Sequence, residues 1–511
     1  MKFEQEKTKI LTPICFFDSS VTQSVDEQLN LPDYCSDIKR ILKCTLQPNI
    51  NSVQVTGDRI SVKGELLIRL LYVSENEKID CCEQTAEISK NIDVKNMPEN
   101  AAVTVLPGVE YVNCRAASQR RATVSASVSL SVKVCCVNET ELPSVKPSED
   151  VQVLNRTVTA VNRTVLGEKT FDLSETVELD EAKKPIGKLV SQDAIALVES
   201  VKAVSGKLLV KGELKVRVLY CDDSEERAFQ YLTHEMPISQ IVEIPGLTED
   251  CSNNVRLFVK SLMLEPKADS SGNNRLLEAA AKVSAVIFST SESRIEVIAD
   301  CYCTECETQS EYKNLDFLSL AHTLEKNDSV TETAELPCDK IDRIIDAKII
   351  KTAAAASAMG DSLEIKASVS AEILFTDSEG KMQIAQRSVD FDISDKLKKK
   401  CKKIECRPVL TVTGVKCEPE DGAKAKITLE YYVMADVFSV ETQRVCTDVK
   451  PAPEKKKPEK DCTIAICYCK KGESLWEIAK KYNTAVSGIK EENGIEGDIV
   501  VSDMMIMIPC K

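Results

Sequence analysis

Residues 55–72 read VTGDRISVKGELLIRLLY, and residues 204–220 read VSGKLLVKGELKVRVLY. The two stretches share Lys-Gly-Glu-Leu, at Lys63–Leu66 and Lys211–Leu214. A weaker third copy, MGDSLEIKASVSAEILF, runs from Met359 to Phe375. Similarity that returns along a chain in this way is typical of tandem repeats of one structural unit. The sequence therefore predicts three copies of one domain.

Apolar and polar residues alternate within each copy. The alternating apolar positions of the first copy are Ile60, Val62, Leu66, Ile68, Leu70 and Tyr72. Those of the third copy are Ile365, Ala367, Val369, Ala371, Ile373 and Phe375. Successive side chains of a β-strand point to opposite faces, so a period of two predicts half-buried strands. Gly57, Gly206 and Gly360 precede these strands and favour hairpin turns, because glycine tolerates positive φ.

Two further segments accompany each copy. A short apolar cluster precedes it, at Ile38–Leu42, Ile186–Val190 and Ile341–Ile345. A second alternating strand follows it, at Ala122–Val134, Ala281–Ile287 and Ala425–Val437. We therefore predict a mainly β protein with three tandem β-rich repeats, sandwich-like or barrel-like, at residues 1–145, 150–303 and 310–446.

The C-terminal region has a different character. Residues 447–461 are rich in proline and lysine, which predicts a semi-extended linker that lets the last residues move independently. Residues 462–511 then follow the pattern strand, helix, helix, strand. Ser474 and Glu477 match a capping box at the start of the first helix, and Gly494 matches a left-handed C-cap at the end of the second. We predict a small, separate βααβ domain.

Composition and charge exclude several classes of function. The 511 residues include 66 Lys and Arg against 81 Asp and Glu, which gives a net charge of −15 and a pI of about 5.0. A net negative chain is a poor general binder of nucleic acids or anionic membranes. No apolar run approaches the ~20 residues of a membrane span, so we expect no membrane insertion. The start, MKFEQEKTKILTPICFF, does not match a signal peptide, so we expect the protein to stay where it is made.

The 22 cysteines and two histidines are the main candidates for reactive chemistry. In a long chain without an export signal, the thiols are expected to be reduced and many of them buried. Cys301, Cys303 and Cys306 form Cys-x-Cys-x-x-Cys, a candidate soft-metal site without a fourth ligand nearby. Outward-facing thiols are candidates for cross-linking in an oxidised assembly. Neither His234 nor His322 lies in a catalytic motif, so we expect no enzyme activity, no cofactor and no metal.

The C-terminal domain resembles a LysM domain. The matching residues are Gly472-Glu473-Ser474-Leu475-Trp476, Ile478–Tyr482, Asn493-Gly494 and Ile506–Pro509. The three repeats resemble SPOCS domains through the glycine, strand, Lys-Gly-Glu-Leu, strand pattern of the first two copies. Together they resemble the SipL family of clostridial spore-coat morphogenetic proteins. The resemblance implies a non-enzymatic protein of the mother-cell cytoplasm, at the forespore surface, that helps coat layers encase the forespore.

The resemblance also implies partners and a binding surface. The LysM domain of the family contacts the coat-basement ATPase, stage IV sporulation protein A, and the repeats would bind other spore-coat proteins or self-associate. LysM domains bind N-acetylglucosamine chains between two loops, so peptidoglycan or N-acetylglucosamine binding is the alternative function. The candidate contact residues for either ligand are Lys471, Gly472, Glu473, Ser474, Leu475, Trp476, Asn493, Gly494, Ile495, Ile499 and Val500. Trp476 is either a binding hot spot or a core residue of the first helix.

Overall fold

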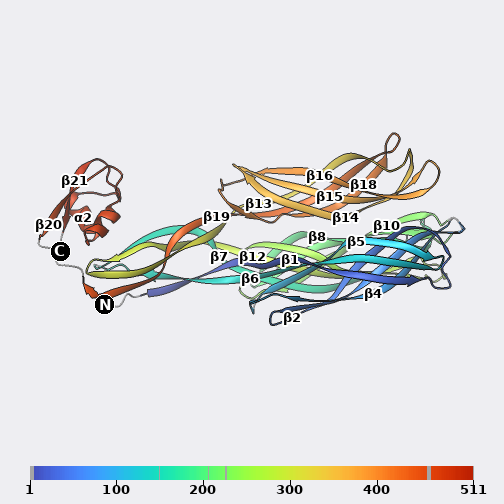
Figure 1. The fold of residues 1–511 in the computed structure, drawn as a ribbon, viewed down its shortest axis with the longest axis horizontal. Helices are drawn as coiled ribbons and strands as arrows, with labels where there is room; N and C mark the ends of the chain where they lie inside the picture. Colours follow the sequence, from blue (N-terminus) through green and yellow to red (C-terminus); the bar gives the residue numbers. More distant parts are fainter. Residues whose placement is uncertain are drawn as a thin grey trace.

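The computed structural model describes residues 5–76, 78–99, 101–148, 150–204, 206–224, 227–456 and 462–509. Strands dominate these residues, which confirms the mainly β prediction. The molecule is elongated: three β-sandwiches lie together at one end, a narrow stalk follows, and the C-terminal domain lies at the other end (Figure 1). Neither helix in the described part of the chain has the length and apolar character needed to cross a bilayer.

Repeat 1 is a sandwich of two three-stranded antiparallel sheets. Its strands are β1 (Gln5–Asn30), β2 (Ile38–Thr56), β3 (Arg59–Ser74), β4 (Ile79–Asp93), β5 (Ala102–Ser118) and β6 (Arg121–Val145). One sheet has the order β2-β3-β4 and the other the order β1-β6-β5. The alternating positions predicted in β3, from Ile60 to Tyr72, are fully buried inside the sandwich. Those of β6, from Val124 to Val134, are buried as well, so the predicted strand faces are confirmed.

Repeats 2 and 3 have the same topology, in which the first strand pairs with the last. The strands of repeat 2 are β7 (Val151–Glu178), β8 (Ile186–Val204), β9 (Lys207–Asp222), β10 (Phe229–Glu243), β11 (Ser252–Lys267) and β12 (Leu276–Cys303). Those of repeat 3 are β13 (Cys306–Glu335), β14 (Ile341–Met359), β15 (Ser362–Asp377), β16 (Met382–Lys396), β17 (Ile404–Cys406), β18 (Val409–Pro419) and β19 (Lys424–Lys456). The three tandem repeats are therefore sandwiches rather than barrels.

The Lys-Gly-Glu-Leu signature marks a β-bulge in an edge strand. Gly64 and Gly212 each pair with the residue at which β2 or β8 bulges. A Cβ atom on either glycine would collide with a backbone carbonyl of that edge strand, so only glycine fits there. In repeat 3 the corresponding bulge lies between Ile349 and Lys351, away from Ala367, which stands at the glycine position. The displaced bulge explains why the third copy lacks the signature.

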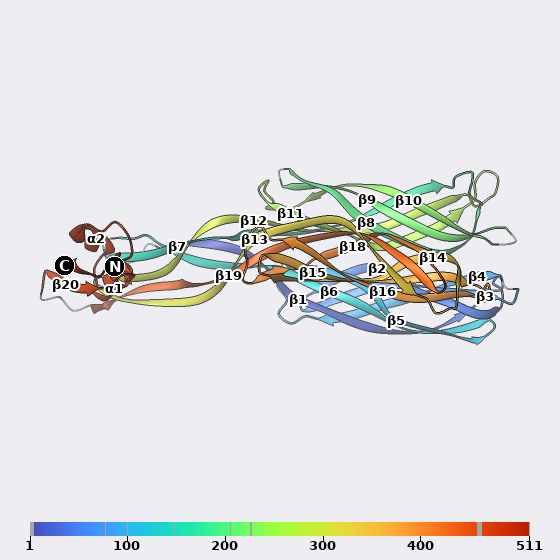
Figure 2. The ribbon, with the colours of Figure 1, turned by 90° about the horizontal axis from the view of Figure 1, so that it is seen from above.

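The long outer strands of the repeats form the stalk. We use this name for the ends of β1, β6, β7, β12, β13 and β19 that run beyond the sandwiches (Figure 2). A buried apolar cluster holds them together, with members from all three repeats: Ile10, Leu142, Val158, Ala160, Ile295, Val297, Phe317 and Val445. Each repeat thus contributes a strand pair to one common core.

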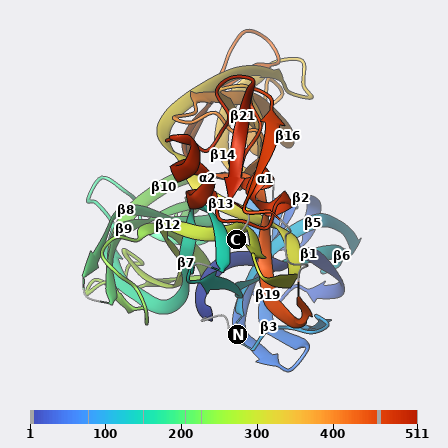
Figure 3. The ribbon, with the colours of Figure 1, turned by 90° about the vertical axis from the view of Figure 1, so that its left-hand side faces the viewer.

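The three sandwiches also pack against one another around the long axis (Figure 3). Leu71, Leu219 and Leu374 hold equivalent positions, each directly before a buried aromatic residue of its own sandwich. They point away from that sandwich, yet they are only 5, 2 and 7% exposed because they share one apolar cluster between the repeats. The three repeats therefore form one packed body.

Charged side chains add an ion pair at each boundary between repeats. The pairs are Lys188–Asp80 between repeats 1 and 2, Arg217–Asp346 between repeats 2 and 3, and Lys43–Glu372 between repeats 1 and 3. All three carboxylates are buried. Since a buried charge without its partner is strongly destabilising, these pairs favour this arrangement of the repeats over others.

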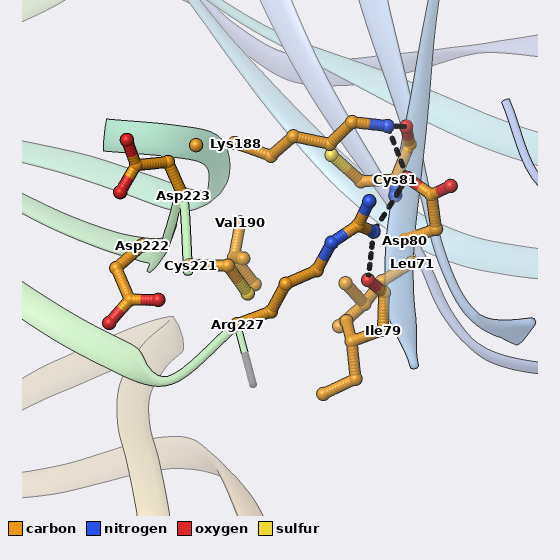
Figure 4. A pocket seen from close by; sticks show the side chains of 11 residues that line it. Leu71, Ile79, Asp80, Cys81, Lys188, Val190, Cys221, Asp222, Asp223 and Arg227 are labelled. Carbon is orange, nitrogen blue, oxygen red and sulfur yellow. Dashed lines mark hydrogen bonds and ion pairs between the residues drawn. The ribbon is translucent and has the colours of Figure 1, made fainter. Parts of the chain in front are cut away.

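A pocket of about 150 Å³ lies at the boundary between repeats 1 and 2 (Figure 4). Asp80 accepts a hydrogen bond from Lys188, and the Arg227 guanidinium lies 3.8 Å from the same carboxylate. Burial alone would raise the pKa of Asp80, but the hydrogen bonds from Lys188 and from Ser36 hold that pKa below its ordinary value. The pocket is therefore lined by charged side chains of both repeats, with Lys188 and Arg227 of repeat 2 facing Asp80 of repeat 1.

The C-terminal domain has the predicted βααβ order. Its elements are β20 (Ile464–Cys469), α1 (Leu475–Lys481), α2 (Val486–Asn493) and β21 (Met504–Pro509). Gly494 ends α2 with a φ of 61°, as predicted. The capping box is wrong: Ser474 is the N-cap of α1 but makes no side-chain capping bond. Instead, the Leu475 N–H donates to the Asp498 carbonyl of the facing loop.

Residues 447–456 differ from the predicted linker. They continue β19 and pair with β13, where Pro451 faces Thr308. In the described residues, the pairing of β17 and β18 with β19 ends at Ser439, and the register of this later stretch is with β13. An edge strand tolerates prolines, which donate no hydrogen bond, and this explains why a proline-rich sequence forms a strand here. Residues 457–461 lie outside the described residues.

Candidate functional site

The two predicted loops of the C-terminal domain lie against each other. The Gly472 N–H donates to the Val500 carbonyl at 2.8 Å, and the Val500 N–H donates to the Glu473 carbonyl at 2.9 Å. An isolated antiparallel bridge joins Ser474 to Ile499. These backbone contacts make one continuous surface from loops that are far apart in the sequence.

The predicted contact residues fall into two groups. Leu475 and Val500 are buried in the core of the domain, where they pack with Ile478, Ile489 and Ile506. The remaining residues are exposed or half-buried: Lys471, Gly472, Glu473, Ser474, Trp476, Asn493, Gly494, Ile495 and Ile499. A ligand on the loops therefore meets backbone and polar groups, with Ile499 as the most exposed apolar side chain among the predicted residues.

Asn493 fastens the second loop to the closing strand. Its Nδ2 donates to the carbonyls of Ile489 and Met507, at 2.8 and 2.6 Å, and its Oδ1 accepts from the Met507 N–H at 2.7 Å. Because these backbone hydrogen bonds occupy the side-chain amide of Asn493, this residue positions the second loop instead of offering its amide to a ligand.

The outer face of the β20–β21 sheet is apolar, a feature that the sequence reasoning missed. Ile464, Ile466 and Tyr468 on β20, with Met505 and Met507 on β21, are between 41 and 69% exposed. In the register, Ile466 faces Met507 and Tyr468 faces Met505, so the side chains form one patch. We call these five residues the apolar sheet face. The signal lay in IAICYC and MMIMIP, where both alternating sets of side chains are largely apolar.

The opposite side of the domain docks on the stalk, contrary to the expectation of independent movement. Trp476 Nε1 donates to Asp300 Oδ2 at 2.8 Å, and Lys480 Nζ lies 2.7 Å from the same oxygen. The Tyr302 hydroxyl donates to the Thr484 carbonyl at 2.7 Å. Both Asp300 and Tyr302 lie on β12 of repeat 2, so the docking joins segments that are remote in the sequence.

The cysteines of the Cys-x-Cys-x-x-Cys motif and the two histidines make contacts within the β-sheet body. Cys303 ends β12 and Cys306 begins β13, with their sulfurs 3.3 Å apart, and Cys301 packs inside the stalk. Burial raises the pKa of Cys301 to about 12. Within the described ranges, no group of three or more metal-ligating side chains comes together. His234 and His322 each lie beside a carboxylate.

This architecture defines a multidomain β-sandwich protein that carries a small C-terminal binding module. A family model described as SipL, SPOCS domain, matches residues 37–117 and 185–266, and a LysM domain model matches residues 470–509. No curated protein matches the chain.

Two segments of the chain therefore match the SPOCS domain of SipL and its C-terminal part matches a LysM domain, a combination that fits a SipL-like sporulation protein. Both families are binding or structural domains. The SPOCS matches cover β2 to β5 of repeat 1 and β8 to β11 of repeat 2. Repeat 3 shares the topology of the matched repeats, with its bulge displaced.

Proposed function

We propose that this protein is a non-enzymatic assembly factor of the spore coat, whose LysM domain binds the coat-basement ATPase, stage IV sporulation protein A. The three SPOCS repeats would then serve as one body that carries further coat contacts or self-association. The site of action in this proposal is the forespore surface in the mother-cell cytoplasm. The SPOCS and LysM family matches support the sporulation role, and the surface of the LysM domain supports a protein partner.

The observation that carries this proposal is the apolar sheet face. Five large side chains with exposures of 41 to 69% are grouped on one face of the β20–β21 sheet of the C-terminal domain. Large exposed apolar patches on soluble domains are typical of protein interfaces, and aromatic and methionine side chains are enriched there. A glycan ligand offers hydroxyl groups to such a face and does not account for its two methionines.

Glycan binding remains the second candidate, because LysM domains as a class take N-acetylglucosamine chains. It would use the joined loops, where Gly472, Glu473 and Gly494 are exposed. The two candidates therefore place their ligands on different surfaces of the same domain. Substitutions on one of these surfaces should therefore weaken binding of one ligand and leave binding of the other unchanged.

The test is capture of the full-length chain by two baits, purified coat-basement ATPase on beads and insoluble peptidoglycan. Ile466→Glu and Met507→Glu place a charge on the apolar sheet face, at positions that are 68 and 41% exposed, and circular dichroism checks that each variant is folded. We expect each variant to weaken ATPase capture roughly 30-fold, as for a hot spot worth about 2 kcal/mol. Met263→Glu is the matched control, since Met263 is 74% exposed on repeat 2. Capture by peptidoglycan alone would overturn the proposal.

A further inference from the structure

The end of the stalk holds an anionic and aromatic site that the LysM helix occupies. The Asp300 carboxylate accepts hydrogen bonds from Trp476 at 2.8 Å and from Lys480 at 2.7 and 2.8 Å. A third donor, the Tyr312 hydroxyl, lies on the stalk itself at 2.7 Å. Asp300 therefore binds one cation and one indole N–H of a separate domain while a stalk residue fixes its orientation.

Tyr302 supplies the apolar part of this contact. It is 2% exposed and belongs to the same buried cluster as Leu475, Ile478 and Ile489 of the LysM domain. Its ring meets the Trp476 ring edge to face, with centroids 4.9 Å apart. A stalk side chain thus completes the core of the LysM domain, which makes the contact a packed interface.

The site is built jointly by two repeats. Asp300 and Tyr302 come from β12 of repeat 2, whereas Tyr312 comes from β13 of repeat 3. The Arg444 guanidinium of β19 lies over the Tyr312 ring, 4.3 Å from its centre, and makes a cation–π contact with it. The site is therefore complete only when the strands of repeats 2 and 3 have packed into the stalk.

The docked side of the LysM domain determines which side is left for partners. Trp476 and Lys480 on α1 bind the stalk through Asp300, while the apolar sheet face stays exposed. In Figure 1 the domain lies at the end of the molecule away from the three sandwiches. The same contact that fixes the domain thus leaves its apolar face free.

We propose that Asp300, Tyr302 and Tyr312 form a receptor site for the LysM helix α1, which holds the domain in a fixed orientation with the apolar sheet face presented to the protein partner. The inference rests on the proposed function of that face. We call this contact between α1 and the stalk the latch. A domain held in its binding orientation loses less conformational freedom on association than a flexibly tethered domain, so the latch strengthens binding to the partner. Since the receptor site needs both repeats, the LysM domain is presented only by a correctly assembled stalk.

The sole tryptophan of the chain, Trp476, reports directly on the latch. We would measure its emission maximum, its quenching by acrylamide and its anisotropy decay in the full-length protein. Asp300→Ala and Lys480→Ala remove the two sides of the ion pair, and Asp448→Ala is the control, because Asp448 forms an ion pair with Lys450 on the stalk. ATPase capture is measured on the same samples, together with Ile466→Glu.

In the wild type and the control we expect a blue-shifted, poorly quenched Trp476 that rotates with the whole molecule. Asp300→Ala and Lys480→Ala should each red-shift the emission, add a fast rotation and weaken ATPase capture roughly tenfold. Fast rotation of Trp476 in the wild type would overturn the latch. Release of the domain with unchanged capture, while Ile466→Glu abolishes capture, would overturn its role in presentation. Unchanged capture by Ile466→Glu would instead refute the proposed function.

Discussion

Leu219 tests whether the three repeats form one packed body. It points away from its own sandwich and is 2% exposed because it packs in the boundary cluster with Leu71 of repeat 1 and Leu374 of repeat 3. Leu219→Ala therefore removes apolar volume from the boundary and leaves the core of repeat 2 intact. Leucine-to-alanine changes at buried sites cost about 2–5 kcal/mol. We expect about 2–3 kcal/mol here, because a boundary between domains relaxes more easily than a sandwich core.

Hydrogen exchange measured peptide by peptide resolves this change, whereas a single unfolding curve of a multidomain protein does not. A loss of about 2–3 kcal/mol speeds exchange roughly 30- to 150-fold in peptides that open with the boundary. The faster peptides should lie in β3, β9 and β15, which contribute Leu71, Leu219 and Leu374. Ile241→Ala is the control, because Ile241 lies on β10 of the same repeat and is 56% exposed. Equal exchange in the two variants would refute the packed arrangement.

Three further predictions concern the bulge, the latch and the thiols. Gly64→Ala should destabilise repeat 1 by about 1–3 kcal/mol, since the added Cβ would collide with the Asn49 carbonyl. The measurement is urea unfolding monitored by hydrogen exchange in peptides of repeat 1, and an unchanged urea midpoint would contradict the bulge explanation. Burial opposes ionisation of Asp300, but hydrogen bonds from Lys480, Trp476 and Tyr312 outweigh it and lower the pKa of Asp300. The ionised Asp300 carboxylate therefore stabilises docking fully above its ordinary pKa of about 3.9, and this stabilisation is lost as the pH falls through the lower pKa of the docked state. Acid should thus red-shift Trp476 emission in the wild type but not in Asp300→Ala. Burial raises the pKa of Cys81 to about 11 and that of Cys221 to about 12, so both thiols should resist iodoacetamide in the native protein at pH 8, and rapid labelling seen by mass spectrometry would be the contrary result.

The strand faces of the repeats are predictable because they depend on local alternation. Ile60 to Tyr72 and Val124 to Val134 alternate in sequence and are buried in the structure. The βααβ order of the LysM domain is predictable for a similar reason, since Gly494 and the apolar runs act locally. An apolar pattern with a period of two or 3.6 residues indicates by itself which face of a strand or helix is buried.

The packing between repeats is not predictable from such patterns. Leu71 and Val73 break the alternation of β3 by being buried on its other face, where Leu71 packs in the apolar cluster between the repeats. The run LLYV at residues 70–73 was the available signal, because strands buried on both faces read as continuous apolar stretches. Which surfaces meet depends on contacts between residues far apart in the chain, such as Arg217 with Asp346.

The candidate site was predictable only in part. Family resemblance placed the two loops, and the structure brings them together through Gly472 and Val500. The docking of Trp476 on Asp300 gave no sequence signal, since the two residues lie in different domains. The strand at residues 447–456 was missed because a proline- and lysine-rich sequence is typical of linkers, and pairing with β13 overrides that preference.

A binding titration of the full-length protein with the purified coat-basement ATPase and, separately, with soluble N-acetylglucosamine oligomers distinguishes the two candidate functions. We expect saturable binding to the ATPase that Ile466→Glu weakens and Met263→Glu leaves unchanged. The proposed function would be contradicted by saturable binding to the oligomers together with no binding to the ATPase.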